Sequence, residues 1–105
     1  MSTTMLNAAT TTATGSAFQI RATNDIYTNR SFQAVGVMSA ATGTATILIE
    51  VSNDGANYVT LGTIGLTLTT SPSSDAFFAF TTYEFYRARI TQITANGTVS
   101  VYMKA

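Results

Sequence analysis

The sequence TATILIEVSNDGANYVTLGTI, residues 44–64, holds two strand-like runs joined by a turn. From Ile47 to Val51 the β-branched residues take every second position, which is the period of a strand with one buried face. Within the turn, Asp54 tolerates a left-handed backbone and Gly55 adopts one without steric cost, as a tight hairpin requires. This stretch therefore predicts a β-hairpin.

Similar runs, separated by turn signals, continue along the rest of the chain. About eight short strands, with no segment of helical period, predict an all-β fold, either a β-sandwich or a small barrel. Of these, a single antiparallel β-sandwich of jelly-roll or immunoglobulin-like type is the prediction. Gly36 interrupts one run and predicts a bulge or the close approach of another strand. The runs lie at residues 17–22, 26–38, 46–51, 58–64, 65–70 (a short strand or a return), 76–81, 83–94 and 97–104.

The first fourteen residues differ from the rest in composition. Residues 1–14 are rich in Thr and Ala and carry no charge, which fits either an edge strand or an extended N-terminal arm that adds to an adjacent subunit. They lack the basic start and apolar centre of a signal peptide, so we expect synthesis in a cytoplasm. Residues 15–105 are expected to form the β-sandwich domain, since 105 residues suffice for one core.

The composition excludes several classes of function. The chain has no Cys and no His, so it lacks a thiolate, a disulfide framework and the commonest general base and transition-metal ligand. Its net charge is zero and it has no basic amphipathic stretch, which argues against nucleic-acid and membrane partners. We therefore expect a protein that is not an enzyme and that binds no cofactor.

The low charge content points to assembly. Charged residues make up 10% of the chain, against roughly a quarter in an average soluble domain. Thr, Ser and Asn replace them, and a neutral, sparsely charged surface tends to associate. A permanent assembly is the favoured interpretation, and a monomer kept soluble by its hydroxyl groups is the alternative.

The carboxylates show no sign of a catalytic or metal site. They are isolated from one another in sequence, whereas glycosidase chemistry needs two that converge on one bond. The loop at residues 53–57 offers one carboxylate and two amides, fewer carboxylates than a calcium site requires, so a structural turn is the favoured interpretation. The five carboxylates are Asp25, Glu50, Asp54, Asp75 and Glu84.

The candidate interface residues come from the last two predicted strands and the hairpin. Arg87 and Arg89 are two positions apart and so share one face of a strand, alongside Phe85. They fit three roles: gripping an anion such as a sugar acid, pairing across strands with Glu50, or pairing with a neighbouring subunit. The cross-strand pair is favoured. Tyr102 and Phe85 are the candidates for exposed aromatic contacts, because each is expected to oppose an apolar stripe.

Three segments resemble a family of phage proteins. The hairpin IEVSNDGANYVTLG (residues 49–62), the strand YEFYRARIT (residues 83–91) and the closing NGTVSV (residues 96–101) are similar in order and spacing to segments of small β-sandwich structural proteins of tailed bacteriophages. This resemblance spans more than half of the chain. It implies a virion structural protein of the capsid decoration (cement) type, which binds surfaces of an assembled particle and performs no chemistry.

The resulting prediction is a capsid decoration protein located in the virion. Its expected partners are the major capsid protein and copies of itself, as a trimer or dimer. The alternative is a tail- or fibre-associated module that binds a receptor or glycan.

Overall fold

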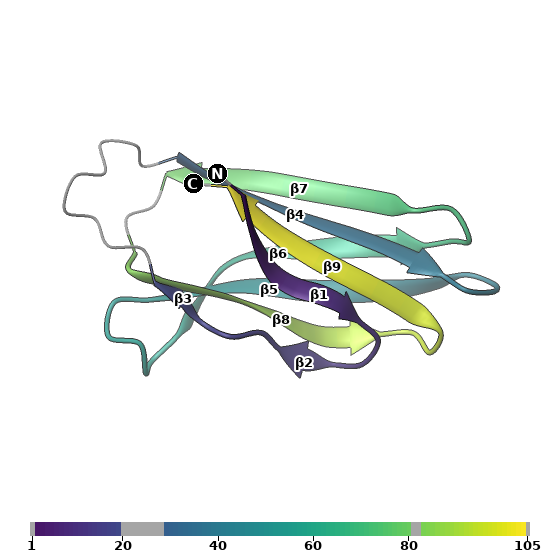
Figure 1. Cartoon of the computed structure of the whole chain (residues 1–105), viewed down its shortest axis with the longest axis horizontal. Helices are drawn as coiled ribbons and strands as arrows, with labels where there is room; N and C mark the ends of the chain where they lie inside the picture. The colour runs from purple at the N-terminus through teal and green to yellow at the C-terminus, as the bar shows by residue number, and fades with distance from the viewer. Residues whose placement is uncertain (1, 20–28, 81–82, 105) are drawn as a thin grey trace.

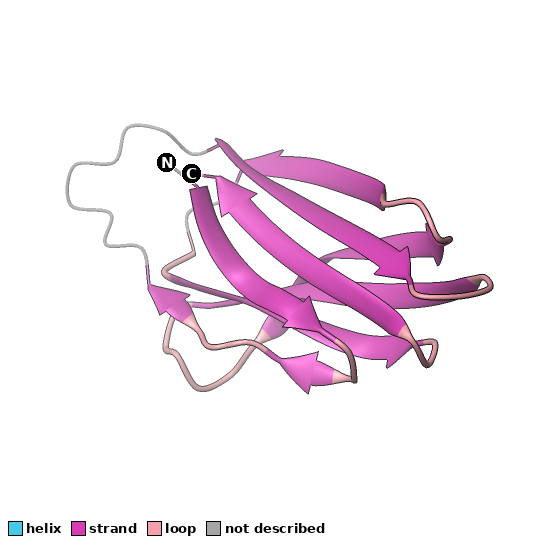
Figure 2. Ribbon diagram, turned by 45° about the vertical axis from the view of Figure 1, so that its right-hand side comes forward, coloured by secondary structure: helices cyan, strands magenta, loops and turns pink. Residues whose placement is uncertain are grey.

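The computed structural model describes residues 2–19, 29–80 and 83–104, and within these it contains nine β-strands and no helix (Figures 1 and 2). The predicted all-β, antiparallel sandwich is confirmed. None of these residues forms a helix long and apolar enough to cross a membrane. The strands are β1 (Ser2–Ala9), β2 (Ala13–Thr14), β3 (Phe18–Gln19), β4 (Asn29–Met38), β5 (Gly43–Ser52), β6 (Val59–Leu68), β7 (Ser73–Phe80), β8 (Phe85–Ile93) and β9 (Gly97–Lys104).

Two sheets pack face to face. The first sheet has the strand order β1-β9-β4-β7, and the second sheet has the order β2-β8-β5-β6 with β3 also on β8. All of their strand pairs are antiparallel. The alternating apolar residues of the strands face one another between the sheets and form a single core. Its largest fully buried side chains include Tyr86, Phe32, Ile47, Ile49 and Met103.

The predicted hairpin is confirmed as β5 and β6. Gly55 adopts a φ of +74° in the loop between them, the left-handed conformation expected of it. The second arm is longer than predicted, because β6 continues without a break to Leu68 instead of ending at Ile64. Leu66 and Leu68 keep the same two-residue period and are buried, so the strand gains core contacts by continuing.

The N-terminal segment belongs to the sandwich itself. Ser2–Ala9 is the edge strand of the first sheet and pairs with β9, while Ala13–Thr14 pairs with β8 of the second sheet. Met5 is buried in the core at 7% exposure. Over the described residues the segment is therefore an edge strand, because it pairs with β9 along the main chain and buries an apolar side chain in the core.

Gly36 marks a close approach, as one of its two interpretations predicted. A Cβ at this position would lie 2.5 Å from Cδ2 of Leu68, on the opposite sheet. The register of β4 with both of its neighbours is unbroken, so Gly36 is not a bulge. Asp25 and the break between the predicted runs at residues 17–22 and 26–38 lie outside the described residues, as does the part of the first run beyond Gln19.

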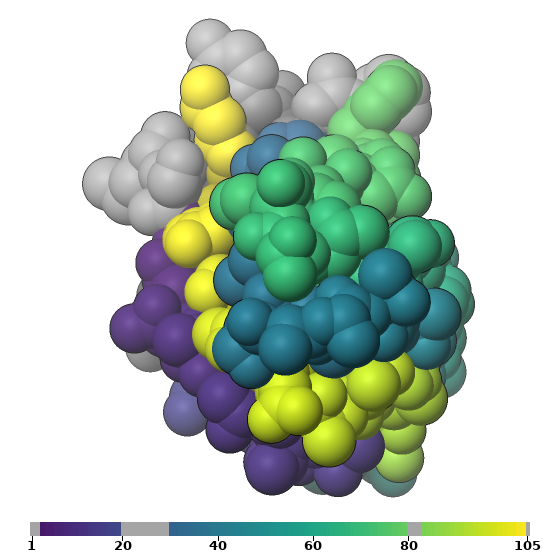
Figure 3. Space-filling view, turned by 90° about the vertical axis from the view of Figure 1, so that its right-hand side faces the viewer, coloured from purple at the N-terminus to yellow at the C-terminus, as the bar shows by residue number. Residues whose placement is uncertain are grey.

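Three connections at one end of the sandwich carry no charged side chain. Figure 3 views this end, where the connections at residues 39–42, 69–72 and 94–96 lie close together. Their sequences, SAAT, TTSP and TAN, contain hydroxyl, amide, alanine and proline side chains only. The β5–β6 loop, with Asp54, lies at the opposite end of strands β5 and β6.

Candidate functional site

An ion-pair cluster occupies the outer face of the second sheet. Glu50 on β5 lies directly opposite Arg87 on β8, and Leu48 lies opposite Arg89. Nε of Arg87 donates to Oε1 of Glu50 at 2.8 Å, and Nη1 of Arg89 lies 3.5 Å from Oε2. The cross-strand pair favoured by the sequence is therefore confirmed, and it involves both arginines.

The shared carboxylate is the most enclosed of the three groups. The Glu50 side chain is 8% exposed, against 28% for Arg87 and 49% for Arg89. A carboxylate removed from water needs charged partners, and two guanidinium groups supply them. Since two cations share one anion, the cluster keeps one net positive charge.

Tyr58 also belongs to this cluster. The guanidinium carbon of Arg87 lies 3.8 Å from the centroid of its ring, which places the cation over the aromatic face. Tyr58 immediately precedes β6, the strand beside Glu50, so the end of the hairpin loop places its ring at this cluster.

The five candidate interface residues do not form one site. Glu50, Phe85, Arg87 and Arg89 lie on the second sheet, whereas Tyr102 lies on β9 in the first sheet, opposite Gln33. Both aromatic residues are half-buried, less open than expected.

The hairpin loop accounts for the burial of Phe85. A Cβ on Gly55 would approach the Phe85 ring to 3.1 Å, so the loop covers part of that ring.

The loop at residues 53–57 is organised around Asp54. Its Oδ1 accepts hydrogen bonds from the backbone N–H groups of Asn57 and Ala56, and from the hydroxyl of Ser52 at 2.7 Å. Its Oδ2 accepts one from the amide of Asn57. The backbone N–H groups of Asn57 and Ala56, then the side chains of Asn57 and Ser52, hold the pKa of this carboxyl well below its usual range. These contacts are those of a structural turn, as predicted.

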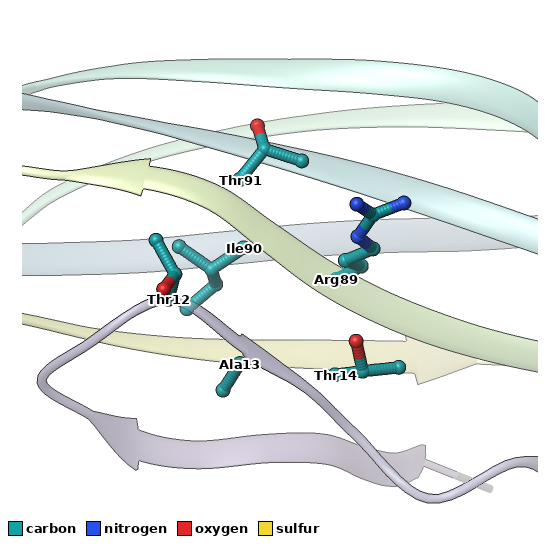
Figure 4. A pocket seen from close by; sticks show the side chains of 6 residues that line it. All are labelled: Thr12, Ala13, Thr14, Arg89, Ile90 and Thr91. Atoms are coloured by element: carbon teal, nitrogen blue, oxygen red, sulfur yellow. The ribbon is translucent and has the colours of Figure 1, made fainter.

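A shallow pocket of about 320 Å³ lies beside the ion-pair cluster (Figure 4). It is lined by Thr12, Ala13 and Thr14 on one side and by Arg89, Ile90 and Thr91 on the other. Arg89 and Thr14 lie opposite each other in the strand register. Among the described residues, the only polar partner of the Arg89 guanidinium is Glu50 at 3.5 Å, so most of its donors are available to a ligand.

Sequence reasoning missed the threonines of this pocket. Thr12 and Thr14 stand in a uniform Thr/Ala stretch, and only the pairing of β2 with β8 brings them to Arg89.

The outer face of the first sheet carries little charge. Phe78 on β7 is 70% exposed, and the half-buried Val35, Val37 and Tyr102 lie on the same face. Beside them is a hollow of about 160 Å³ lined in part by Tyr102 and Lys104. Lys104 is the only charged residue among the described side chains that alternate outward on this sheet.

Comparison with known proteins adds evidence about the fold. No family model matches the chain. No curated protein matches it either. Among solved structures it is similar to the PBSX exported protein XepA, with a TM-score of 0.63 and 12% sequence identity over 98% of this chain. The chain spans 36% of the length of that structure. At this identity the likeness concerns the fold: the β-sandwich described above matches one part of XepA.

Proposed function

We propose that this chain is a structural protein of a bacteriophage virion, and more narrowly a capsid decoration protein. Two separate similarities support the coarser assignment. The segments at residues 49–62, 83–91 and 96–101 resemble small phage β-sandwich proteins, and the structural neighbour XepA is a protein of the phage PBSX.

The observation that carries the narrower assignment is the outer face of the first sheet. A phenylalanine that is 70% exposed, on the same outer face as two half-buried valines and Tyr102, is unfavourable in contact with water. Aromatic residues are enriched, and charged residues depleted, at the centre of protein interfaces. This face has that character, and a capsid surface would cover it.

The proposed mechanism involves binding alone. The protein would sit where capsid subunits meet and bury additional area there. Because it binds the assembled shell and not the dissociated subunits, it would stabilise the shell by a free energy that rises with the logarithm of its free concentration above the dissociation constant. The role requires neither a cofactor nor a catalytic residue.

Co-sedimentation of the purified protein with shells of the phage or prophage that encodes it tests this role. The wild-type protein is expected to pellet with the shells and raise their disruption temperature. Phe78→Ser should weaken binding, and Val59→Ser is the matched control, since Val59 is 58% exposed but lies on the second sheet. A wild-type protein that stays in the supernatant, or equal effects of the two variants, would contradict the proposal.

The Arg89 pocket favours a second candidate, a tail or fibre module that binds an acidic glycan. A half-exposed guanidinium with available donors, in a pocket that threonines also line, suits a sugar carboxylate. Titration with glucuronic acid, followed by NMR, should then shift the amides of Thr14 and Arg89. The uncharged sugar glucose is the control ligand. Binding lost in Arg89→Gln would support this candidate, and no shift at millimolar glucuronic acid would exclude it.

A further inference from the structure

The edge strands of the two sheets differ in how they are protected. An open edge presents unpaired N–H and C=O groups to any other chain, and proteins commonly block such edges. The register of β1 with β9 is irregular at two points, and Ala8 has a φ of 51°. β2 and β3 contain two residues each. Bulges and very short strands are two known ways of blocking an edge.

The edge strand β7 is protected by a charge. Asp75 lies opposite Ala34, which is fully buried, so Asp75 stands on the inward side of its strand. An inward-pointing charge at an edge opposes the addition of another strand, which would enclose it. Pro72 precedes this strand and lacks a backbone donor.

The edge strand β6 has none of these features over most of its length. Val59–Leu68 contains no charged residue and no proline. Its register with β5 shifts once, near its start, and is unbroken from Gly62 to Leu68. Within the described residues, this segment is the longest regular and uncharged stretch of edge.

The hydrogen bonds of β5 show which groups of β6 face outward. Thr44 accepts from the backbone N–H of Thr94 and donates its own N–H to the Thr94 hydroxyl, so its main chain points towards β8. Its partner on the other side, Thr67, is therefore in a non-hydrogen-bonded pair, with N–H and C=O directed away from β5. The Thr67 carbonyl accepts from the Ser73 hydroxyl at 2.8 Å, as this direction requires. By the two-residue period, the main chains of Gly65 and Thr63 face outward as well.

These outward groups are self-complementary. Thr63, Gly65 and Thr67 are evenly spaced about Gly65, all three are exposed, and a Cβ at Gly65 would meet nothing within 4 Å. We propose that β6 of one copy pairs with β6 of a second copy, antiparallel, about a twofold axis at Gly65. Gly65 then lies opposite its own equivalent, and Thr63 of each copy lies opposite Thr67 of the other. Each pair exchanges two main-chain hydrogen bonds, for which the Thr67 carbonyl uses the lone pair not bonded to the Ser73 hydroxyl. The two second sheets then become one continuous sheet.

This inference draws on the proposed structural role for the expectation that the protein assembles. Its test measures self-association of the protein in solution, without capsid shells. If the edge pairing fails, the shell-binding experiment still tests the proposed function independently.

The first experiment measures mass by light scattering and sedimentation equilibrium. The wild-type protein is expected to change from the monomer mass of 11.1 kDa to twice that value over the micromolar range. Gly65→Lys places like charges opposite each other across the axis, and should raise the dissociation constant by an order of magnitude or more. Ser74→Lys, an exposed position on the edge strand β7, is the matched control and should leave the constant unchanged.

A charge-complementary pair of variants sharpens the test. Gly65→Glu alone should dissociate like Gly65→Lys, but an equal mixture of the two should form a mixed dimer, since opposite charges then meet at the axis. A wild-type protein that remains at 11.1 kDa throughout overturns the inference. So does a dimer that both variants leave intact, because it must use another surface.

Hydrogen exchange on the wild-type protein provides a reading that does not depend on any variant folding. The amides of Thr63, Gly65 and Thr67 should exchange several-fold more slowly at high than at low protein concentration. The amides of Ile64 and Leu66 point towards β5 and should be protected equally at both concentrations. Exchange at Gly65 that is independent of concentration would overturn the inference.

Discussion

The ring of Phe77 occupies the space that a side chain on Gly62 would need. A Cβ built on Gly62 would lie 2.5 Å from Cζ of Phe77, although the two residues belong to different sheets. The ring also packs against Phe32, with the centroids 5.2 Å apart. Phe77 therefore closes one side of the sandwich, between β6 and β7, and position 62 must remain without a side chain for it to do so.

Gly62→Ala should destabilise the fold. The added methyl group forces the aromatic ring or the backbone to move, and overpacking of this kind typically costs about 1–3 kcal/mol. Gly65→Ala is the control on the same strand, because its methyl group would meet no atom within 4 Å. It should be neutral or stabilising by up to about 1 kcal/mol, through a restricted unfolded chain. Urea unfolding measures both changes, and equal effects would contradict this account of position 62.

The two arginines of the ion-pair cluster should contribute unequally to stability. Arg87 is hydrogen-bonded to Glu50, lies over Tyr58 and is the less exposed of the pair. Arg87→Leu leaves an enclosed carboxylate without its closest partner, and should cost about 1–3 kcal/mol. Arg89→Leu removes a longer and more exposed contact, so the expected cost is below about 1 kcal/mol. The unfolding midpoints in urea test the order, and a larger loss in Arg89→Leu would refute it.

The stability of the hairpin loop should depend on pH through Asp54. Hydrogen bonds in the folded state lower the pKa of this carboxyl from its ordinary value of 3.8, so folding favours the charged form. The resulting stabilisation is present above the pKa of the unfolded chain and is lost as the pH falls towards the lowered pKa. Asp54→Asn should be less stable than wild type at neutral pH, and the difference should narrow below about pH 4. Urea unfolding across this range checks the trend, and a constant difference would contradict it.

The N-terminal strand should matter to the core. Met5 is 7% exposed, and its truncation to Ala should cost about 2 kcal/mol or more. Thr4→Ala, at the exposed neighbouring position, is the control and should change little. Thermal unfolding would report the difference. A Met5→Ala variant as stable as wild type would mean that residues 2–9 behave as a free arm.

The central strands could be predicted because their information is local. Strand β5 and its loop could be predicted from the two-residue period of Ile47, Ile49 and Val51 and from the turn at Gly55. Strand β9 has the predicted bounds Gly97–Lys104. The length of β6 was underestimated, since the predicted runs at residues 58–64 and 65–70 are parts of one strand. At Gly62 the absence of a side chain leaves room for the Phe77 ring. At Gly65 a side chain would meet no atom within 4 Å, so this position lies on an open part of the strand.

The candidate site was predicted only in part. The Glu50–Arg87 pair could be predicted because the two-residue period of each strand shows which side chains point away from the core, and this period can be read from the sequence. The position of Tyr102 on the opposite sheet depends on strand order, and the approach of Thr14 to Arg89 depends on a pairing across 75 positions of sequence. No local pattern encodes either contact.

The pairing of β1 with β9 has a consequence for modular use of this fold. Ser2 lies opposite Lys104, so the two ends of the described chain leave the sandwich side by side (Figure 1). A unit with adjacent ends can be placed within a surface loop of a longer polypeptide without forcing that loop apart. It can also be circularly permuted: a short linker from Lys104 to Ser2, with new ends opened beside Gly55, would keep every strand in its present sheet.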